Sequence, residues 1–224
     1  TQRWIDSEML VPMNDYLEGR EDHTRVLEEV YPWTAQEGIY YGVPFITQFS
    51  TANTLITMRQ DWLDNLGLEY PETIDEFTEV LRAFTEDDPD GNGEDDTYGY
   101  TDVKPIGNFN WALYAHGLRF GDFSLDGDTV IPTFEDPAWI PAMTWVKELW
   151  DAGYIDQEYM LNDNRMKEEK FFQGRAGAMP AALFRHVSRI EGNLQELFPE
   201  ASIAYGLPPK GEDGNFGLSP QGKT

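Results

Sequence analysis

The stretch "YPETIDEFTEVLRAFTEDDPD" at residues 70–90 constrains the fold most, because it predicts a helix with a marked beginning and a regular apolar face. Thr73 and Glu76 have the spacing of a capping box, in which two side chains satisfy backbone N–H groups at the helix start. Apolar residues then recur at intervals of three and four positions, which is typical of an amphipathic helix packed on a core. These residues are Ile74, Phe77, Leu81 and Phe84.

Helices and short strands alternate along the rest of the chain. Leu55 to Met58 reads as a buried strand that runs into a short helix closed by Gly67. Asp126 and Gly127 lie between two strand-like runs of 121–134 and predict a hairpin. Further helices are expected within 13–33, 136–155 (with Pro137 in the first turn), 164–182 and 193–217, and further strands within 38–49, 164–182 and 193–217. This alternation predicts an α/β domain.

A large excess of acidic residues restricts the partners of the chain. Its 224 residues include 16 Lys and Arg against 41 Asp and Glu, a formal net charge of −25. This balance argues against nucleic acid and anionic membranes, because phosphate contacts require Lys and Arg. The chain has no cysteine, which removes disulfides, thiolate metal sites and cysteine nucleophiles. No apolar run approaches the ~20 residues that span a bilayer.

The loop "DPDGNGEDDTYGY" at 88–100 has the oxygen pattern of a calcium site. An EF-hand loop offers ligands at positions 1, 3, 5, 7 and 9, requires Gly at position 6 and closes with Glu at position 12. Gly93 falls at position 6, but Gly99 stands at position 12, so Asp96 or a neighbouring side chain, Asp95 or Thr97, would have to complete the shell. The alternative is a solvated acidic turn. The predicted ligands are Asp88, Asp90, Asn92, the Glu94 carbonyl and Asp96.

A calcium ion in this loop would have a structural role. The loop joins the capped helix to the next segment, and a saturated oxygen cage leaves no open position of the kind that a catalytic metal keeps. We therefore expect calcium to be a structural cofactor that carries no chemistry.

The helix and the loop together resemble a known family. "YYGVPF", followed by "MRQDWLDNLGLEYPETIDEFTEVLRAFTEDDPDGNGEDDTYGY", is similar to family 1 extracellular solute-binding proteins of ABC importers, in their lipoprotein-type, oligosaccharide-binding branch. "DAGYID", "FFQGRAGAM" and "AYGLPPKGEDGNFG" resemble later parts of the same family more loosely. The resemblance implies calcium binding by the loop ligands given above, with the sixth ligand open at Thr97.

The resemblance implies a periplasmic-binding-protein-like fold of type II, α/β, with a central sheet flanked by helices. Members have two lobes joined by crossover strands. Tyr41 to Phe45 resembles the first crossing and Ala204 to Pro208 the return, so the chain would be mainly the C-terminal lobe of a longer polypeptide. The expected division is a remnant of the first lobe at 1–42, the second lobe at 43–208, and a return segment at 209–224.

The resemblance also implies a function and a location. The protein would bind an oligosaccharide or another polar solute outside the membrane and deliver it to ABC permease subunits. It would be a monomer, either anchored as a lipoprotein or periplasmic, and it would not be an enzyme.

Candidate ligand residues combine aromatic platforms with hydrogen-bonding side chains, as sugar sites do. "GNFNWALY" at 107–114 and "AALFRHVSRI" at 181–190 supply most of them, and the crossing segment supplies the rest. For the aromatic residues the alternative is packing in the core. The candidates are Asn108, Phe109, Trp111, Phe184, Arg185, Tyr41 and Gln48.

Two other classes of function stay open. A fragment of a secreted glycoside hydrolase would also have an aromatic cleft, with two carboxylates some 5–10 Å apart. With 41 acidic residues the number of carboxylates cannot decide this, although no GxSxG, HExxH or Walker motif is present. A calcium-stabilised carbohydrate-binding or adhesion module of the dockerin kind repeats the loop, whereas this chain has it once.

Overall fold

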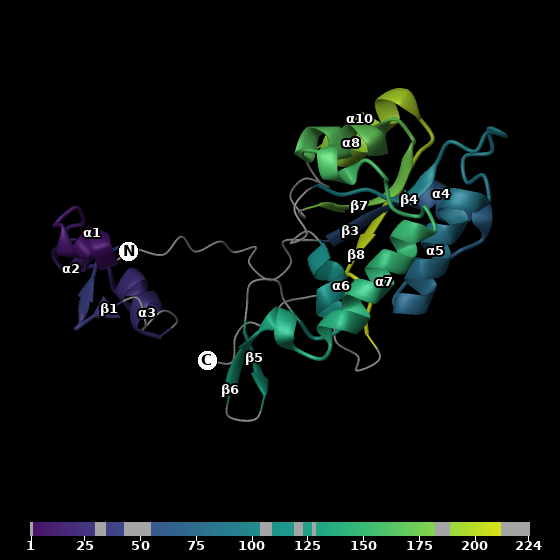
Figure 1. Ribbon diagram of the computed structural model, residues 1–224. Coiled ribbons are helices and arrows are strands. Elements are labelled where there is room, and N and C mark those ends of the chain that lie inside the picture. The colour runs from purple at the N-terminus through teal and green to yellow at the C-terminus, as the bar shows by residue number, and fades with distance from the viewer. Residues whose placement is uncertain are drawn as a thin grey trace. The chain divides into compact units, whose positions relative to one another are not determined.

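The computed structural model divides the chain into two compact units, Thr1–Ser50 and Thr51–Thr224, which we describe separately (Figure 1). The predicted boundary between 1–42 and 43–208 falls at the edge of the described residues and stays a prediction. None of the described helices is long and apolar enough to cross a membrane. The structure describes residues 2–29, 35–42, 55–103, 109–118, 123–126, 129–181 and 189–211.

The unit Thr1–Ser50 consists, where described, of short helices and a small antiparallel ribbon. The Asn14 side chain joins them, because its amide donates to the Gly38 carbonyl and accepts from the Tyr40 N–H, each at 3.0 Å. Gly19, with φ of +73°, separates two helices within the range predicted as one helix. The elements are α1 (Gln2–Asp6), α2 (Asn14–Leu17), α3 (Glu21–Glu29), β1 (Ala35–Gln36) and β2 (Ile39–Tyr40).

A mixed sheet of four strands forms the centre of the unit Thr51–Thr224. The strands lie in the order β4-β7-β3-β8, with β3 antiparallel to both its neighbours and β4 parallel to β7. Their bounds are β3 (Leu55–Arg59), β4 (Tyr98–Tyr100), β7 (Ala176–Ala181) and β8 (Ile203–Gly206). The predicted buried strand at 55–58 is confirmed as β3, in which every residue is buried.

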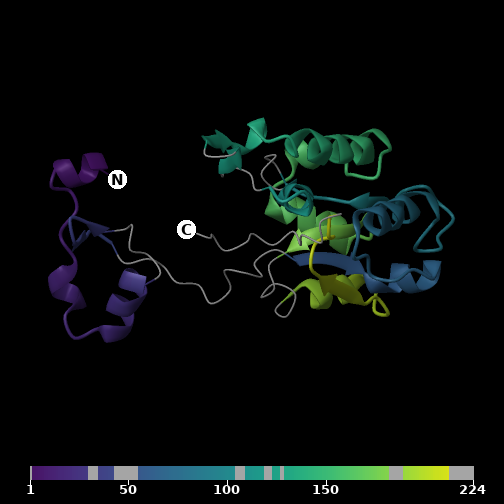
Figure 2. The same ribbon diagram turned by 90° about the horizontal axis from the view of Figure 1, so that it is seen from below.

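Helices cover both faces of this sheet (Figures 1 and 2). Ile56 and Met58 of β3 join the core shared with α4 to α7, whereas Met179 and Ala181 of β7 join the core shared with α8 and α10. Strand residues alternate between faces, so each face requires its own helical cover. The helices are α4 (Gln60–Leu66), α5 (Ile74–Glu86), α6 (Asn110–Ala115), α7 (Trp139–Asp151), α8 (Asn164–Phe172) and α10 (Glu191–Leu197). The predicted α/β class, a central sheet flanked by helices, is confirmed.

The predicted helix ends are largely confirmed. Thr73 accepts from the Glu76 N–H while the Glu76 carboxylate accepts from the Thr73 N–H, which completes the capping box at the start of α5. Gly67 takes the left-handed conformation after α4, with φ of +68°. Helix α7 begins at Trp139, so Pro137 precedes the helix and is not in its first turn as predicted.

The predicted hairpin is also confirmed. Strands β5 (Phe123–Asp126) and β6 (Thr129–Pro132) pair antiparallel, with Leu125 opposite Val130, and the turn at 127–128 lies outside the described residues. The short helices η3 (Thr133–Glu135) and η4 (Tyr159–Leu161) precede α7 and α8 respectively.

Candidate functional site

The start of β3 and the ends of β4, β7 and β8 lie at the same edge of the central sheet. Leu55, where β3 begins, pairs with Ala181, where β7 ends, and the end of β8 at Gly206 pairs with Ile56. Because β4 runs parallel to β7, its carboxyl end points to this edge too. Ligands of open α/β sheets bind outside the carboxyl ends of strands, so this edge is the candidate site.

The segments predicted to carry ligand contacts follow β4 and β7 directly. Asn108 lies in the segment after β4, and Phe184 and Arg185 lie in the segment after β7. These three residues and Gln48 lie outside the described residues, so their role stays a prediction. The sheet order means that both segments start from the same edge.

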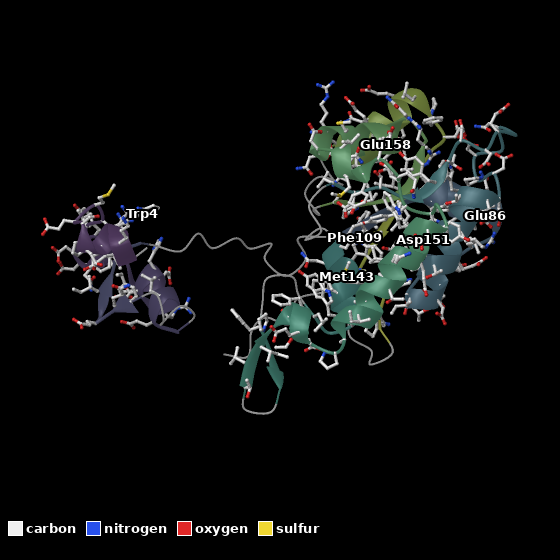
Figure 3. The ribbon with its side chains drawn as sticks, viewed as in Figure 1. Trp4, Glu86, Phe109, Met143, Asp151 and Glu158 are labelled. Atoms are coloured by element: carbon white, nitrogen blue, oxygen red, sulfur yellow. The ribbon has the colours of Figure 1, made fainter. Side chains whose placement is uncertain are left out.

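The predicted aromatic platforms are core residues in the structure. Phe109 and Trp111 are each only 2% exposed, so neither offers a free ring face to a solute. Phe109 is labelled in Figure 3. Trp111 packs at 5.0 Å from the rings of Phe77 and Trp145. Tyr41 is partly buried in the unit Thr1–Ser50. The structure thus places the two aromatic residues as the core alternative does.

A buried polar network lies directly behind the edge. Asp156 Oδ2 accepts hydrogen bonds from Lys170 Nζ at 2.7 Å, and from Asn162 Nδ2 and Thr101 Oγ1 at 2.8 Å each. Asn162 Nδ2 also donates to the Asp102 carbonyl at 2.9 Å. All five residues are buried, so the network ties the end of β4 to the segment around η4 and to α8.

Two carboxyl groups of this region have opposite pKa shifts. Burial acts to raise the pKa of Asp156, but the hydrogen bonds from Lys170, Asn162 and Thr101 outweigh it and lower the pKa below its usual value. Burial raises the pKa of Asp102 to about 7, although the Lys167 ammonium and the Val103 N–H act in the opposite direction. The two carboxyls are thus held in different protonation states between acidic and neutral pH.

Sequence reasoning missed this network. Asp156 stands in the "DAGYID" motif that carried the family resemblance, but its partners Lys170 and Thr101 lie 14 and 55 positions away. No local periodicity connects residues at such spacings. A buried lysine in a helix of low apolar content, α8, is the nearest signal that the sequence provides.

The predicted calcium loop follows α5, whose last residue, Glu86, is labelled in Figure 3. Asp88 adopts the left-handed region with φ of +46°, and its carboxylate accepts from the N–H groups of Asn92 and Gly93, each at 3.1 Å. The Asn92 amide nitrogen donates to Asp90 at 3.0 Å and to Asp96 at 3.4 Å. The carboxylates of Asp88, Asp90 and Asp96 are thus each hydrogen-bonded within the loop, to Asn92.

The amide of Asn92 now partners the carboxylates of the loop. In the described parts of the chain no three His, Cys, Asp or Glu residues are grouped so that they could hold a metal ion. Partial burial raises the pKa of Asp90, and the neighbouring Asp96 and Asp88 carboxylates add to the rise. The arrangement is therefore short of positive charge.

The packing of β4 explains why the closing Glu of an EF-hand is missing. A Cβ atom at Gly99 would lie 2.6 Å from the backbone oxygen of Leu81, so α5 and β4 are too close for any side chain. Thr97, the predicted substitute ligand, is buried and its hydroxyl donates to the Phe84 carbonyl at 2.8 Å. Asp95 is exposed.

The first strand of the central sheet, β3, thus starts at the same edge at which its last strand, β8, ends. No family model matches the chain. The chain is 32% identical over 190 residues to the lipoprotein LipO of Bacillus subtilis, covering 82% of this chain and 37% of LipO. It is also 32% identical over 173 residues to the polygalacturonan/rhamnogalacturonan-binding protein YtcQ of the same organism, covering 76% of this chain and 34% of YtcQ.

Solved structures share the fold. The Streptococcus pneumoniae ABC-transporter substrate-binding protein FusA, in complex with kestose, matches with a TM-score of 0.70 at 24% identity, over 96% of this chain and 45% of that one. The alginate-binding protein AlgQ2 without calcium ion matches with a TM-score of 0.71 at 24% identity, over 92% and 44%. The chain belongs to the extracellular solute-binding proteins of ABC importers, and it spans about a third of the length of the curated relatives it matches.

Proposed function

We propose that the chain forms one lobe of a protein that captures an oligosaccharide outside the membrane and delivers it to ABC permease subunits. The observation that carries the proposal is the similarity to LipO, YtcQ and FusA together with the single sheet edge at which the chain enters and leaves. A solute held at this edge would be enclosed when a second lobe closes over it.

The segments after β4 and β7 are the proposed contact segments. Asn108 and Arg185 supply hydrogen-bonding groups, and Phe184 supplies an aromatic face for the CH groups of a sugar. Gln48 and Tyr41, from the crossing segment, complete the proposed set. Phe109 and Trp111 are buried in the core and are therefore not among the proposed contacts.

Calorimetry against a panel of glycans tests the proposal. Kestose and trigalacturonate represent the solute classes named for FusA and YtcQ, and the protein should be long enough to include both lobes. Arg185→Ala should weaken binding at least about tenfold, the loss of roughly 1.4 kcal/mol. Arg165→Ala, which removes an exposed arginine paired with Glu169 on α8, should leave the affinity unchanged.

The glycoside hydrolase alternative gives a different result in the same experiment. A hydrolase would shorten the glycan, and product analysis by chromatography would detect this. Turnover would reject the binding-protein proposal, and so would the failure of every glycan to bind the two-lobed protein. The relatives are binding proteins, which supports the proposal that this protein is not an enzyme.

We also propose that the acidic loop binds a structural calcium ion. The ligands would be Asp88, Asp90, Asn92, the Glu94 carbonyl and Asp96, all oxygen donors of the kind calcium prefers. The donor set fits because the loop carries carboxylates whose mutual repulsion a cation would relieve. A FusA structure described as an EF-hand mutant and the AlgQ2 structure described as lacking calcium support the proposal.

The proposed location is outside the membrane, either anchored as a lipoprotein or periplasmic, with the protein acting as a monomer. LipO is named a lipoprotein and FusA an ABC-transporter substrate-binding protein, and both names support this location. The surplus of 25 negative charges is compatible with it, because carboxylates keep a protein soluble and are repelled by anionic surfaces.

A further inference from the structure

Asp102 occupies a special place at the candidate edge. It is the second residue after the end of β4, and the segment that begins after it leads to α6 and contains Asn108. The residue is 1% exposed, although carboxyl groups are rarely buried without a cation bound directly to them. The burial of an acidic side chain at this position is therefore unusual.

The carboxyl group of Asp102 accepts hydrogen bonds from residues on both sides of it in the sequence. Its Oδ1 accepts the Val103 N–H at 2.7 Å, and its Oδ2 accepts the Tyr100 hydroxyl at 3.1 Å. The Tyr100 ring lies 5.2 Å from that of Trp111 in α6. One side chain therefore connects the end of β4, the first residue after it and the aromatic core beneath α6.

The backbone around Asp102 is held by further hydrogen bonds. Asn162 Nδ2 donates to its backbone carbonyl and to Asp156, so the main chain at this point is anchored to the buried network. Thr101 is held by its N–H to the Ala178 carbonyl at 3.0 Å. The carboxyl group is thus the part of this junction that can change state while its backbone stays in place.

Ionisable groups face Asp102 from each element packed against it. Tyr100 comes from β4, Tyr159 from η4 and Lys167 from α8, whose ammonium group donates to the Pro180 carbonyl at the end of β7. Asp156 and Lys170 form their own ion pair beyond Asn162. Lys167 is the cation whose charge acts on Asp102, and burial outweighs it.

We propose that Asp102 is a positioning residue of the candidate edge: its carboxyl group fixes the main chain at the end of β4 through the Val103 N–H and the Tyr100 hydroxyl, and uptake of a proton by this carboxyl changes that hold. The proposal rests on the proposed function only in that the solute binds at this edge. As a carboxylate, Asp102 accepts from both the Val103 N–H and the Tyr100 hydroxyl. Once protonated, one oxygen becomes a donor, so the Tyr100 hydroxyl has to turn and accept instead.

Asp102→Asn imitates the protonated form, because an amide keeps one acceptor oxygen for Val103 and presents N–H donors to Tyr100. Infrared spectroscopy detects the C=O stretch of a buried protonated carboxyl, and amide hydrogen exchange measures the protection of the Val103 N–H. In the unsubstituted protein both signals should change with a midpoint near pH 7. In Asp102→Asn the carboxyl band should be absent at every pH, and the protection of the Val103 N–H should be independent of pH and match that of the unsubstituted protein at about pH 5.5.

A matched control and a second variant keep the test decisive. Glu196→Gln removes one exposed carboxylate of α10 and should retain both transitions. Tyr100→Phe removes a donor that favours the ionised form, so its midpoint should move to higher pH. Transitions that persist in Asp102→Asn, or a midpoint that Tyr100→Phe leaves in place, would overturn the proposal.

Binding measurements then connect the proton to the solute. The Kd for kestose or trigalacturonate should differ at least about threefold between about pH 5.5 and pH 8 in the two-lobed protein, and the difference should vanish in Asp102→Asn. If a probe binds with the same Kd at both pH values, Asp102 does not act on the solute site and the proposal fails. If neither probe binds at all, the proposed function fails, and the spectroscopic measurements still decide what Asp102 does.

Discussion

Carboxylates are concentrated in two regions of the chain, and the two regions differ in the partners that these carboxylates have. Asp156 lies at the buried sheet edge, where Lys170, Asn162 and Thr101 donate to it and lower its pKa. The loop at 88–96 is largely exposed, and its carboxylates face one another with the Asn92 amide as their main donor. A buried carboxylate has to be satisfied by the fold itself, whereas an exposed group of carboxylates can recruit a cation from solution.

The largest effect should come from removing the cation of the buried region. Lys170→Met leaves Asp156 buried without its ion pair, which should cost about 3–5 kcal/mol of unfolding free energy. Denaturant unfolding measures the loss. Lys147→Met is the matched control, because Lys147 pairs with Asp151 on the exposed surface of α7 and should cost below about 1 kcal/mol. Equal losses in both variants would show that the buried network does not stabilise the lobe more than a surface pair does.

Adding the missing cation to the loop should have the next largest effect. Calcium at about 100 times its Kd should raise the unfolding free energy by about 2.7 kcal/mol, since only the folded loop binds it. Asp90→Asn should remove most of this increment, whereas Asp75→Asn, an exposed carboxylate in the first turn of α5, should retain it. Thermal unfolding of protein stripped with a chelator measures the effect. The absence of a calcium response in that protein would leave the loop as a solvated turn.

Substitution of Gly99 tests whether the packing of α5 against β4 excludes a side chain at position 12 of the loop. Gly99→Ala places a Cβ against the Leu81 backbone and should destabilise the lobe by about 1–3 kcal/mol. Gly192→Ala in α10 meets no atom within 4 Å and should be neutral or slightly stabilising, because alanine favours a helix. Denaturant midpoints of the two variants compare them directly. A tolerated Gly99→Ala would mean that α5 and β4 can separate enough to admit a longer side chain.

The smallest effect should come from Arg82, an exposed cation among exposed carboxylates. Its guanidinium bonds Glu79, Glu86 and Asp87, and these hydrogen bonds lower the pKa values of Glu79 and Asp87. The stability they contribute is therefore present above the usual carboxylate pKa and is lost as pH falls through the lowered values. Arg82→Gln should cause a small loss at neutral pH and low salt, and almost none at about 1 M salt, where charges are screened within about 3 Å. A loss that salt does not change would point to packing of the arginine stem instead.

Structural features that depend on residues close together in the sequence were mostly predicted correctly, whereas features that depend on residues far apart in the sequence were missed. The capping box of Thr73, the helix end at Gly67 and the buried strand β3 each depend on residues within a few positions, and each is confirmed. The boundary of α7 was misplaced because proline is compatible with the turn before a helix as well as with its first turn.

The candidate site was harder to predict than the fold. Trp111 is an aromatic residue of the kind that binds sugars, but it is buried against the rings of Phe77 in α5 and Trp145 in α7, and these contacts depend on the tertiary structure. Asp102 and Asp156 give no sign in the sequence of their different pKa values, because burial and distant partners cause both. The loop at 88–96 depends on local spacing as well: Gly93, expected at the sharp turn, has a φ of +81°, whereas calcium binding by the loop stays a prediction.

The order of the strands also has a consequence for how the protein is made. Strand β3 lies between β7 and β8, which are synthesised long after it. At about 5–20 residues per second, the roughly 120 residues from β3 to β7 take on the order of ten seconds to emerge from the ribosome. During that interval both edges of an apolar strand lack their partners, which delays folding and favours aggregation. The central sheet therefore cannot be completed until the chain has been synthesised as far as β8.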